Sequence, residues 1–100
     1  MGQVVLISGG TSGIGKRSAE LFAAGGYQVA ILGRDAIKGQ QAAESLQQSY
    51  PQTKILYIQG DVSKVEDCAK AVAQTVQWGG SLDVLINSAG RYFEKALEDV

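Results

Sequence analysis

Four short aliphatic runs alternate along the chain with three segments of helical periodicity, and no other feature of the sequence constrains the fold as strongly. The aliphatic runs, which we expect to be strands, cover residues 4–7, 29–32, 55–58 and 82–86. Runs that are apolar at consecutive positions are typical of strands buried on both faces of a parallel sheet. The alternation therefore predicts parallel strands joined by right-handed crossovers, with helices on both faces of the sheet.

The three intervening segments place small or apolar residues three and four positions apart, which is the spacing of a helix packed against a sheet. The expected sheet-facing positions are Ile14, Ser18, Leu21, Phe22 and Gly25 in the first helix, Ala36, Gly39, Ala43 and Leu46 in the second, and Val65, Ala69, Val72 and Val76 in the third. Asp35 and Ser63 stand where they can cap the second and third helices. The pairs Gly25-Gly26 and Gly79-Gly80 are suited to end the first and third helices in a left-handed conformation.

The order of the strands in the sheet follows from the doubly wound rule, which gives 3-2-1-4 and reverses the winding between the first and fourth strands. We therefore expect a Rossmann-like, doubly wound parallel sheet in a three-layer α/β/α arrangement. Ligands of such sheets bind at the carboxyl ends of the strands, where the winding reverses. The sequence holds no repeat, low-complexity tract or linker, so we expect a single domain over residues 1–100.

Composition and charge exclude several classes of partner. The formal net charge is −1 and the Lys and Arg residues are dispersed, which disfavours a nucleic acid or an anionic membrane as a partner. Cys68 is the only cysteine, so we interpret it as a small apolar group on a helix face rather than as a reactive thiol. The first apolar run stops at Ser8, which is too early for a signal peptide or a membrane-spanning helix. We expect a cytoplasmic protein that binds no metal.

A glycine-rich segment between the first strand and the first helix carries the strongest functional signal. Gly9 allows a sharp turn, Gly13 allows the backbone to approach a diphosphate, and Gly15 allows close packing of helix on strand. The free N–H groups at the start of the helix would then face the phosphates. A purely structural turn is the alternative, but the position after a strand and before a helix favours phosphate binding. The segment reads Ser8-Gly9-Gly10-Thr11-Ser12-Gly13-Ile14-Gly15, and of these we expect all but Gly10 to contact a dinucleotide.

The spacing of these glycines resembles the Thr-Gly-x-x-x-Gly-x-Gly turn of the short-chain dehydrogenase/reductase family, with Ser8 in place of the usual Thr. Two further matches follow in the right order, Asp61-Val62 after the third strand and Asn87-Ser88-Ala89-Gly90 after the fourth. The resemblance extends over essentially the whole chain but covers only the first half of a family domain.

The resemblance assigns roles to the two later motifs. It implies that Asp61 accepts a hydrogen bond from the adenine amino group and that the backbone at Val62 lines the ring. It also implies that Asn87, Ala89 and Gly90 tie the central strands together and run beneath the cofactor ribose. Taken alone, Asp61 is more often a turn or capping residue, and Asn87 can equally have a purely structural role.

The end of the second strand decides which dinucleotide is bound. NAD sites place an acidic residue there for the ribose 2′-hydroxyl, whereas NADP sites need a cation for the 2′-phosphate. The resemblance implies that Gly33 occupies the place of the acid and that Arg34 offers a bidentate guanidinium to the phosphate. Asp35 could instead be the acidic residue that favours NAD, but we interpret it as the cap of the next helix. The sequence thus predicts NADP, with NAD as the less favoured cofactor.

The resemblance implies a parent enzyme that transfers a hydride between NADP and the carbonyl or alcohol carbon of a small molecule, and we expect that enzyme to be a homo-oligomer. The catalytic Tyr and the Lys four residues later, which the family requires, are not recognisable here. Tyr92 and Lys95 are only three positions apart, so we expect no catalytic residue in this chain. Residues 94–100 look like the opening of a helix, which suggests a truncated domain that self-associates when isolated. A nucleotide-sensing regulator of the same fold and a structural fragment without a ligand are the alternatives.

Overall fold

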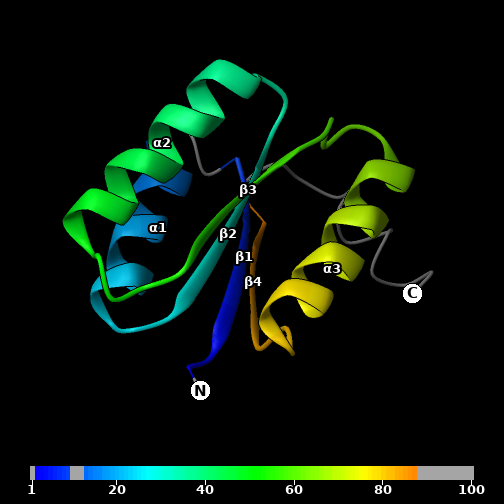
Figure 1. Cartoon of the computed structure of the whole chain (residues 1–100). Coiled ribbons are helices and arrows are strands. Elements are labelled where there is room, and N and C mark those ends of the chain that lie inside the picture. The colour runs from blue at the N-terminus through cyan, green and yellow to red at the C-terminus, as the bar shows by residue number, and fades with distance from the viewer. Residues whose placement is uncertain (1, 10–12, 88–100) are drawn as a thin grey trace.

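Hydrogen bonds join four strands into one parallel sheet in the computed structural model, which describes residues 2–9 and 13–87. The strands are β1 (Val4–Ser8), β2 (Gln28–Gly33), β3 (Ile55–Gln59) and β4 (Val84–Asn87). Their order in the sheet is β3-β2-β1-β4, as Figure 1 shows. The predicted parallel sheet and the predicted strand order are therefore confirmed.

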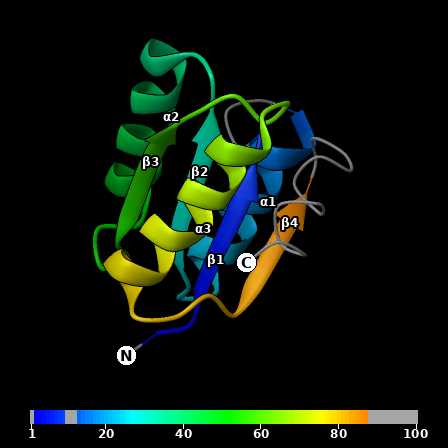
Figure 2. The same ribbon diagram turned by 90° about the vertical axis from the view of Figure 1, so that its right-hand side faces the viewer.

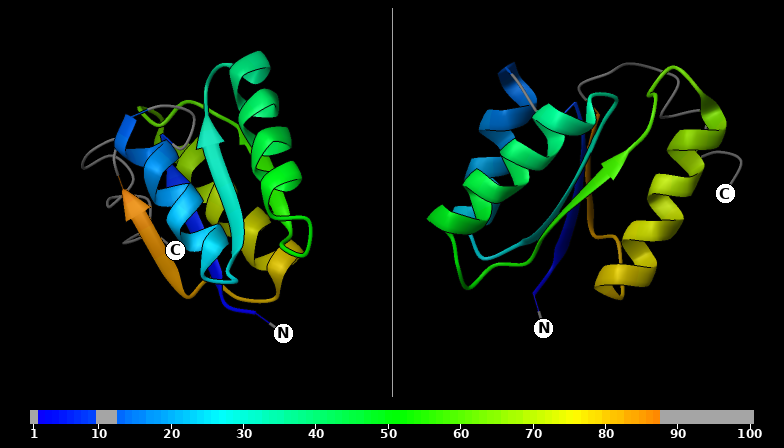
Figure 3. Two further views of the ribbon diagram at one scale, coloured as in Figure 1. Left: turned by 90° about the vertical axis from the view of Figure 1, so that its left-hand side faces the viewer. Right: turned by 45° about the horizontal axis from the view of Figure 1, so that its top comes forward.

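Three helices cover the two faces of this sheet. The helices α1 (Gly13–Ala24) and α2 (Ala36–Ser49) lie side by side on one face, and α3 (Val65–Gly79) covers the other (Figures 1 and 2). The left view of Figure 3 shows α1 and α2 in front of the sheet with α3 behind it. This arrangement confirms the three-layer α/β/α prediction.

The strands are apolar at consecutive positions because each face of the sheet contributes to its own core. Leu6 packs on the α3 side with Leu32 and Ile58, while Val5 and Ile7 pack on the side of α1 and α2. Successive side chains of a strand point to opposite faces, so both cores draw on the same runs. All five residues of β1 are buried, as expected for a central strand.

The predicted helix ends are confirmed at three places. Asp35 caps α2, and its Oδ1 accepts hydrogen bonds from the backbone N–H groups of Ile37 at 3.0 Å and Lys38 at 3.2 Å. Gly26 follows α1 with a φ of 88°, and Gly80 follows α3 with a φ of 87°. Both glycines are in the left-handed region, where an L side chain is strained.

The predicted sheet-facing residues are partly wrong for all three helices. In α1, Ile14 and Leu21 are 78% and 63% exposed, and in α3 Val76 is 41% exposed. Ala36 of α2 is also exposed, although the rest of its predicted face is buried. The buried positions are Gly15, Ala19 and Ala23 in α1, and Cys68, Ala71, Val72 and Thr75 in α3. Small residues prevail at these contacts because they let a helix backbone approach the sheet closely, a preference that hydrophobicity alone does not reveal.

Two predicted boundaries also need correction. Ser63 does not cap α3, because its N–H and its hydroxyl both donate to Asp61 Oδ1, at 2.9 and 2.6 Å. The cap position is Lys64, whose side chain makes no capping bond. The last strand begins at Val84 rather than at residue 82, because Asp83 bonds to β1 through both its N–H and its carboxylate instead of extending the strand pairing.

Cys68 has the structural role predicted for it. The thiol is free and buried, and Sγ donates a weak hydrogen bond to the Val62 carbonyl over 3.4 Å. Burial raises the pKa of the Cys68 thiol, and the nearby carboxylates of Asp67 and Asp61 raise it further. Because the thiolate is the reactive form, we expect iodoacetamide to modify native Cys68 about 100-fold more slowly than the urea-unfolded chain. Mass spectrometry of timed samples measures both rates, and equal rates would contradict the buried position.

Candidate functional site

The parallel sheet brings the predicted site residues to one edge. Parallel strands end on the same side, so the residues that follow β1, β2, β3 and β4 meet at the carboxyl edge. The register pairs Ser8 with Leu32 on one side and with Asn87 on the other. Gly33, which precedes Arg34, is paired with Gln59, two residues before Asp61. Thr11, Ser12, Ala89 and Gly90 lie outside the described residues.

The described part of the glycine-rich segment has backbone angles that favour glycine. Gly9 has a φ of 76° and Gly13 a φ of 59°, both in the left-handed region. The Gly9 N–H donates to the Leu32 carbonyl over 2.8 Å, which fixes the start of the turn to the end of β2. Among residues 2–9 and 13–87, no atom beyond the adjoining backbone lies within 4 Å of a Cβ built on Gly13, so these residues leave open space beside it. Gly13 therefore begins α1 as an exposed residue at the carboxyl edge.

The first turn of α1 has one side against the sheet and one side exposed. Gly15 is buried against the sheet, whereas Ile14 is exposed. The first N–H groups of any α-helix have no partner within the helix, and they carry its positive dipole end. Because α1 begins at the carboxyl edge, these donors lie where a phosphate group could accept from them.

Ser8 and Asn87 connect the two strands between which the winding reverses. Ser8 is fully buried, and its hydroxyl lies 3.2 Å from Asn87 Oδ1 and 3.4 Å from the Ile86 carbonyl oxygen. A buried hydroxyl needs such partners because leaving it unpaired costs about 1–3 kcal/mol. The contact joins the ends of β1 and β4 at the carboxyl edge.

A hollow of about 360 Å³ lies at the carboxyl ends of β2 and β3. Its lining residues are Arg34, Gln59, Gly60, Asp61, Lys64 and Asp67. The Arg34 side chain is 82% exposed, and its Nη1 lies 4.0 Å from Asp61 Oδ2. An ion pair of this length is weak when its cation is as exposed as Arg34, which leaves the guanidinium available to an anionic ligand. The hollow therefore joins the predicted cation to the predicted adenine-binding acid.

Asp61 is held as a charged acceptor by its neighbours. Hydrogen bonds from the Ser63 side chain and backbone lower the pKa of the Asp61 carboxyl, and the charges of Arg34 and Lys64 lower it further. The Asp61 N–H donates to Asp67 Oδ2 over 2.8 Å, which orients the loop. Asp61 therefore has the turn role that the sequence analysis gave as the alternative to adenine binding. Its Oδ2 is not the oxygen that accepts from Ser63, so that turn role does not exclude a ligand.

Sequence reasoning did not identify four of the residues that line this hollow, namely Gln59, Gly60, Lys64 and Asp67. Lys64 and Asp67 follow Asp61 by three and six positions in a loop and the first turn of a helix. No motif marks them, and only the folded loop shows that they approach Asp61. Val62, whose backbone was predicted to line adenine, is partly buried against the α3-side core.

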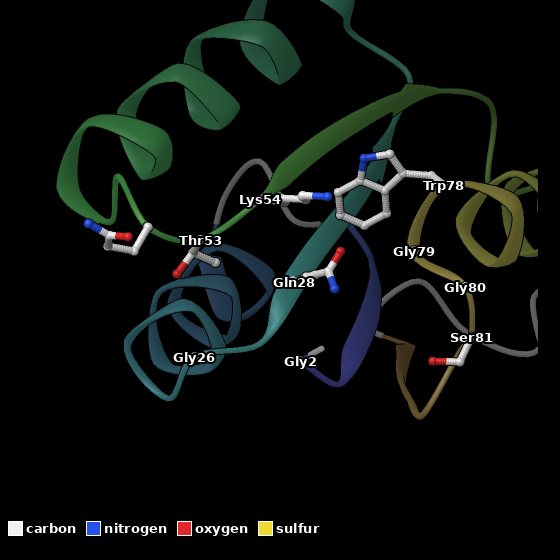
Figure 4. Close-up of a pocket in the computed structure, with 10 residues that line it drawn as sticks. Gly2, Gly26, Gln28, Thr53, Lys54, Trp78, Gly79, Gly80 and Ser81 are labelled. Carbon is white, nitrogen blue, oxygen red and sulfur yellow. The ribbon is translucent and has the colours of Figure 1, made fainter.

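A larger hollow of about 680 Å³ lies at the opposite edge of the sheet (Figure 4). Its lining residues are Gly2, Gly26, Gln28, Gln52, Thr53, Lys54, Trp78, Gly79, Gly80 and Ser81. They come from the amino ends of the strands and the ends of the helices, and none of them belongs to the predicted site. In doubly wound sheets ligands bind at the carboxyl ends of the strands, so the smaller hollow is the better candidate site.

Residues 2–9 and 13–87 contain neither a membrane-spanning helix nor a metal-binding cluster. None of the helices in this part of the chain combines the length and the apolar character needed to cross a bilayer. Within the same residues, no three His, Cys, Asp or Glu side chains gather where they could hold a metal ion.

Comparison with known proteins adds independent evidence. The model of a family described as short chain dehydrogenase matches residues 3–100. The 11-beta-hydroxysteroid dehydrogenase-like 2 protein of Arabidopsis thaliana is 42% identical over 89 residues, which are 89% of this chain and 29% of that protein.

Solved structures match the same part of the fold. L-sorbose reductase from Gluconobacter frateurii, complexed with NADPH and L-sorbose, aligns with a TM-score of 0.84 and 32% identity over 89% of this chain and 34% of its own. An NADPH-bound short chain oxidoreductase from Pseudomonas aeruginosa aligns with a TM-score of 0.84 and 28% identity over 88% of this chain and 34% of its own. The chain thus spans about a third of the length of the proteins it matches.

Proposed function

The chain belongs to the short-chain dehydrogenase family, and from this premise we propose that it is the amino-terminal, cofactor-binding part of an NADP(H)-dependent oxidoreductase. The longer protein, called the complete enzyme below, would transfer a hydride between the nicotinamide and a carbonyl or alcohol carbon of a small molecule. The proposal treats residues 1–100 as part of one dinucleotide-binding domain. It leaves the proton donor to the remainder of the complete enzyme.

The observation that carries the proposal is the glycine turn at the carboxyl edge. Gly9 and Gly13 both have left-handed backbone angles, and α1 begins directly at Gly13. The open space beside Gly13 gives a diphosphate room to approach the first N–H groups of α1. A merely structural turn needs the same angles, but it does not need an exposed glycine at a helix N-terminus beside space that the described residues leave open.

The remaining contacts follow from the positions of the side chains around the smaller hollow. Arg34 would pair with the 2′-phosphate, because a guanidinium forms two parallel hydrogen bonds to phosphate oxygens. Asp61 would accept from the adenine amino group, and the backbone at Val62 would line the ring. Asn87 would hold the end of β4 beneath the ribose, and the loop residues Thr11, Ser12, Ala89 and Gly90 would complete the site. When bound, the cofactor supplies the hydride chemistry, while these residues only bind and orient it.

Two of the similar structures support NADP over NAD as the cofactor. The L-sorbose reductase structure is a complex with NADPH and L-sorbose, and the Pseudomonas aeruginosa oxidoreductase structure is NADPH-bound. This chain has no acidic side chain at Gly33, and it has an exposed guanidinium at the next position. An acid at the position of Gly33 would repel the 2′-phosphate, so its absence fits the same preference.

The substitution Arg34→Asp tests the cofactor assignment. We expect it to weaken NADPH binding to the complete enzyme by about 10- to 30-fold, because a charge-assisted pair is lost and a negative charge faces the phosphate. NADH binding should change by no more than about 2-fold, since NADH lacks the phosphate that Arg34 contacts. Fluorescence titration with both reduced cofactors measures the two dissociation constants.

The matched control for this experiment is Lys70→Asp, which makes the same change of charge on the exposed side of α3. It should leave both dissociation constants unchanged. Unsubstituted enzyme that bound NADH more tightly than NADPH would refute the NADP assignment. An equal loss of affinity for both cofactors in the Arg34→Asp variant would refute the role given to Arg34.

A further inference from the structure

The position of the Arg34 guanidinium depends on the backbone that carries it. The side chain is largely exposed, and its 4.0 Å ion pair with Asp61 is too long to fix its direction. An exposed Arg loses about 2 kcal/mol of rotamer entropy when it is ordered. A ligand therefore binds the guanidinium more tightly if the backbone that carries the side chain is already in the right position. The turn from Gly33 to Asp35 sets the backbone position of Arg34.

Three donors from the end of β3 hold this turn. The Gly33 carbonyl accepts from the Tyr57 hydroxyl over 2.6 Å and from the Gly60 N–H over 3.0 Å. The Gln59 side-chain amide donates to the Arg34 carbonyl over 3.4 Å. Two of these bonds come from side chains rather than from the regular pairing of β2 with β3. The shortest of the three is the bond from Tyr57.

The Tyr57 ring is itself held in place by α2. A Cβ built on Gly39 would overlap the Cε1 and Cζ atoms of Tyr57, so the ring occupies the space that any side chain at residue 39 would need. Gly39 stands one turn after the Asp35 cap and donates its N–H to the Asp35 carbonyl over 2.9 Å. The ring is therefore wedged between β2 and the first turns of α2, with its hydroxyl directed at Gly33.

We propose that Tyr57 is a positioning residue for cofactor selectivity, which directs Arg34 by holding the Gly33 carbonyl. This inference rests on the proposed function, because it takes the 2′-phosphate of NADP as the group that Arg34 contacts. Tyr57 does not touch the cofactor in this arrangement. Its hydroxyl acts through one backbone carbonyl on the guanidinium of the next residue.

The substitution Tyr57→Phe removes the hydroxyl and keeps the ring against Gly39. We expect the KM and Kd for NADPH in the complete enzyme to rise by about 5- to 10-fold, since one neutral hydrogen bond is lost. The kcat at saturating NADPH and the Kd for NADH should stay within about 2-fold, because neither depends on Arg34. Tyr27→Phe is the matched control, since it removes a hydroxyl next to the amino end of β2, and it should change none of these values.

A double-substitution cycle separates positioning from a general structural role. In an Arg34→Gln background, Tyr57→Phe should weaken NADPH binding no further, because the group it positions is absent. Equal losses for NADPH and NADH, an unchanged Kd for NADPH, or the same loss in the Arg34→Gln background would each overturn the inference. The proposed function fails separately, on the unsubstituted enzyme, if that enzyme does not bind NADPH, and the inference would then fall with it.

Discussion

The substitution Gly13→Ala is expected to weaken the binding of both NADPH and NADH to the complete enzyme by about 100-fold. The added methyl group would enter the open space beside the backbone, where the proposed function places the diphosphate. Displacing the diphosphate would cost about two charge-assisted hydrogen bonds, or about 3 kcal/mol, which corresponds to the stated loss of affinity. The free energy of unfolding should fall by only about 1–2 kcal/mol, the strain of an L-residue at a left-handed angle.

The control for this prediction lies at the other end of the same helix. Gly26 has a φ of 88°, and a Cβ there would likewise meet nothing within 4 Å. Gly26→Ala should therefore cost about the same unfolding free energy as Gly13→Ala and leave cofactor affinity unchanged. Urea unfolding and fluorescence titration of both variants measure the two effects. The diphosphate assignment would be wrong if both variants lost affinity in proportion to their stability, or if Gly13→Ala kept the parent affinity.

The fold could be predicted largely from where the aliphatic runs stand. The runs that form β1, β2 and β3 contribute residues to the cores on both faces of the sheet. An error of one residue in a strand boundary therefore does not alter the inferred parallel sheet. The order β3-β2-β1-β4 then follows from the general rules of crossover handedness and winding. The carboxyl edge could be predicted for the same reason, since parallel strands bring their following loops together.

The faces of the helices could not be predicted as well. Ile14 and Leu21 are seven residues apart and so share one face of α1, but the neighbouring face with Ala19 and Ala23 packs on the sheet. Both faces satisfy the spacing of three and four residues. The difference lies in side-chain volume, because small residues let the helix approach a twisted sheet more closely. Apolar periodicity therefore predicts a helix more reliably than it predicts the buried side of that helix.

Long-range side-chain contacts around the site were also beyond sequence reasoning. Tyr57 and Gly33 are separated by 24 positions, and Asp61 and Asp67 by six. No spacing marks such pairs, because they depend on the register of β2 with β3 and on the path of one loop. Position along the chain could predict Arg34 and Asp61, since they lie one and two residues after the ends of their strands. It could not predict that Tyr57 holds the turn in front of Arg34.

The effect of Gly39→Ala on the free energy of unfolding is expected to change sign according to the residue at position 57. In the parent enzyme the new Cβ would overlap the Tyr57 ring, and either the ring or α2 must move. Moving the ring breaks its hydrogen bond to Gly33, and moving the helix opens the core around the buried Ala43 and Leu46. Overpacking of this kind should lower the free energy of unfolding by about 2–3 kcal/mol.

In a Tyr57→Ala background the same substitution should instead raise the unfolding free energy by about 0.5–1 kcal/mol. The space beside residue 39 is then vacant, and alanine in a helix interior is favoured over glycine by that amount because it loses less backbone entropy on folding. Denaturant unfolding of the parent, the two single variants and the double variant gives a coupling energy, which should exceed about 2 kcal/mol. An equal effect of Gly39→Ala in both backgrounds would show that the Tyr57 ring does not rest on Gly39. The packing that directs the Tyr57 hydroxyl at the Gly33 carbonyl would then have no support.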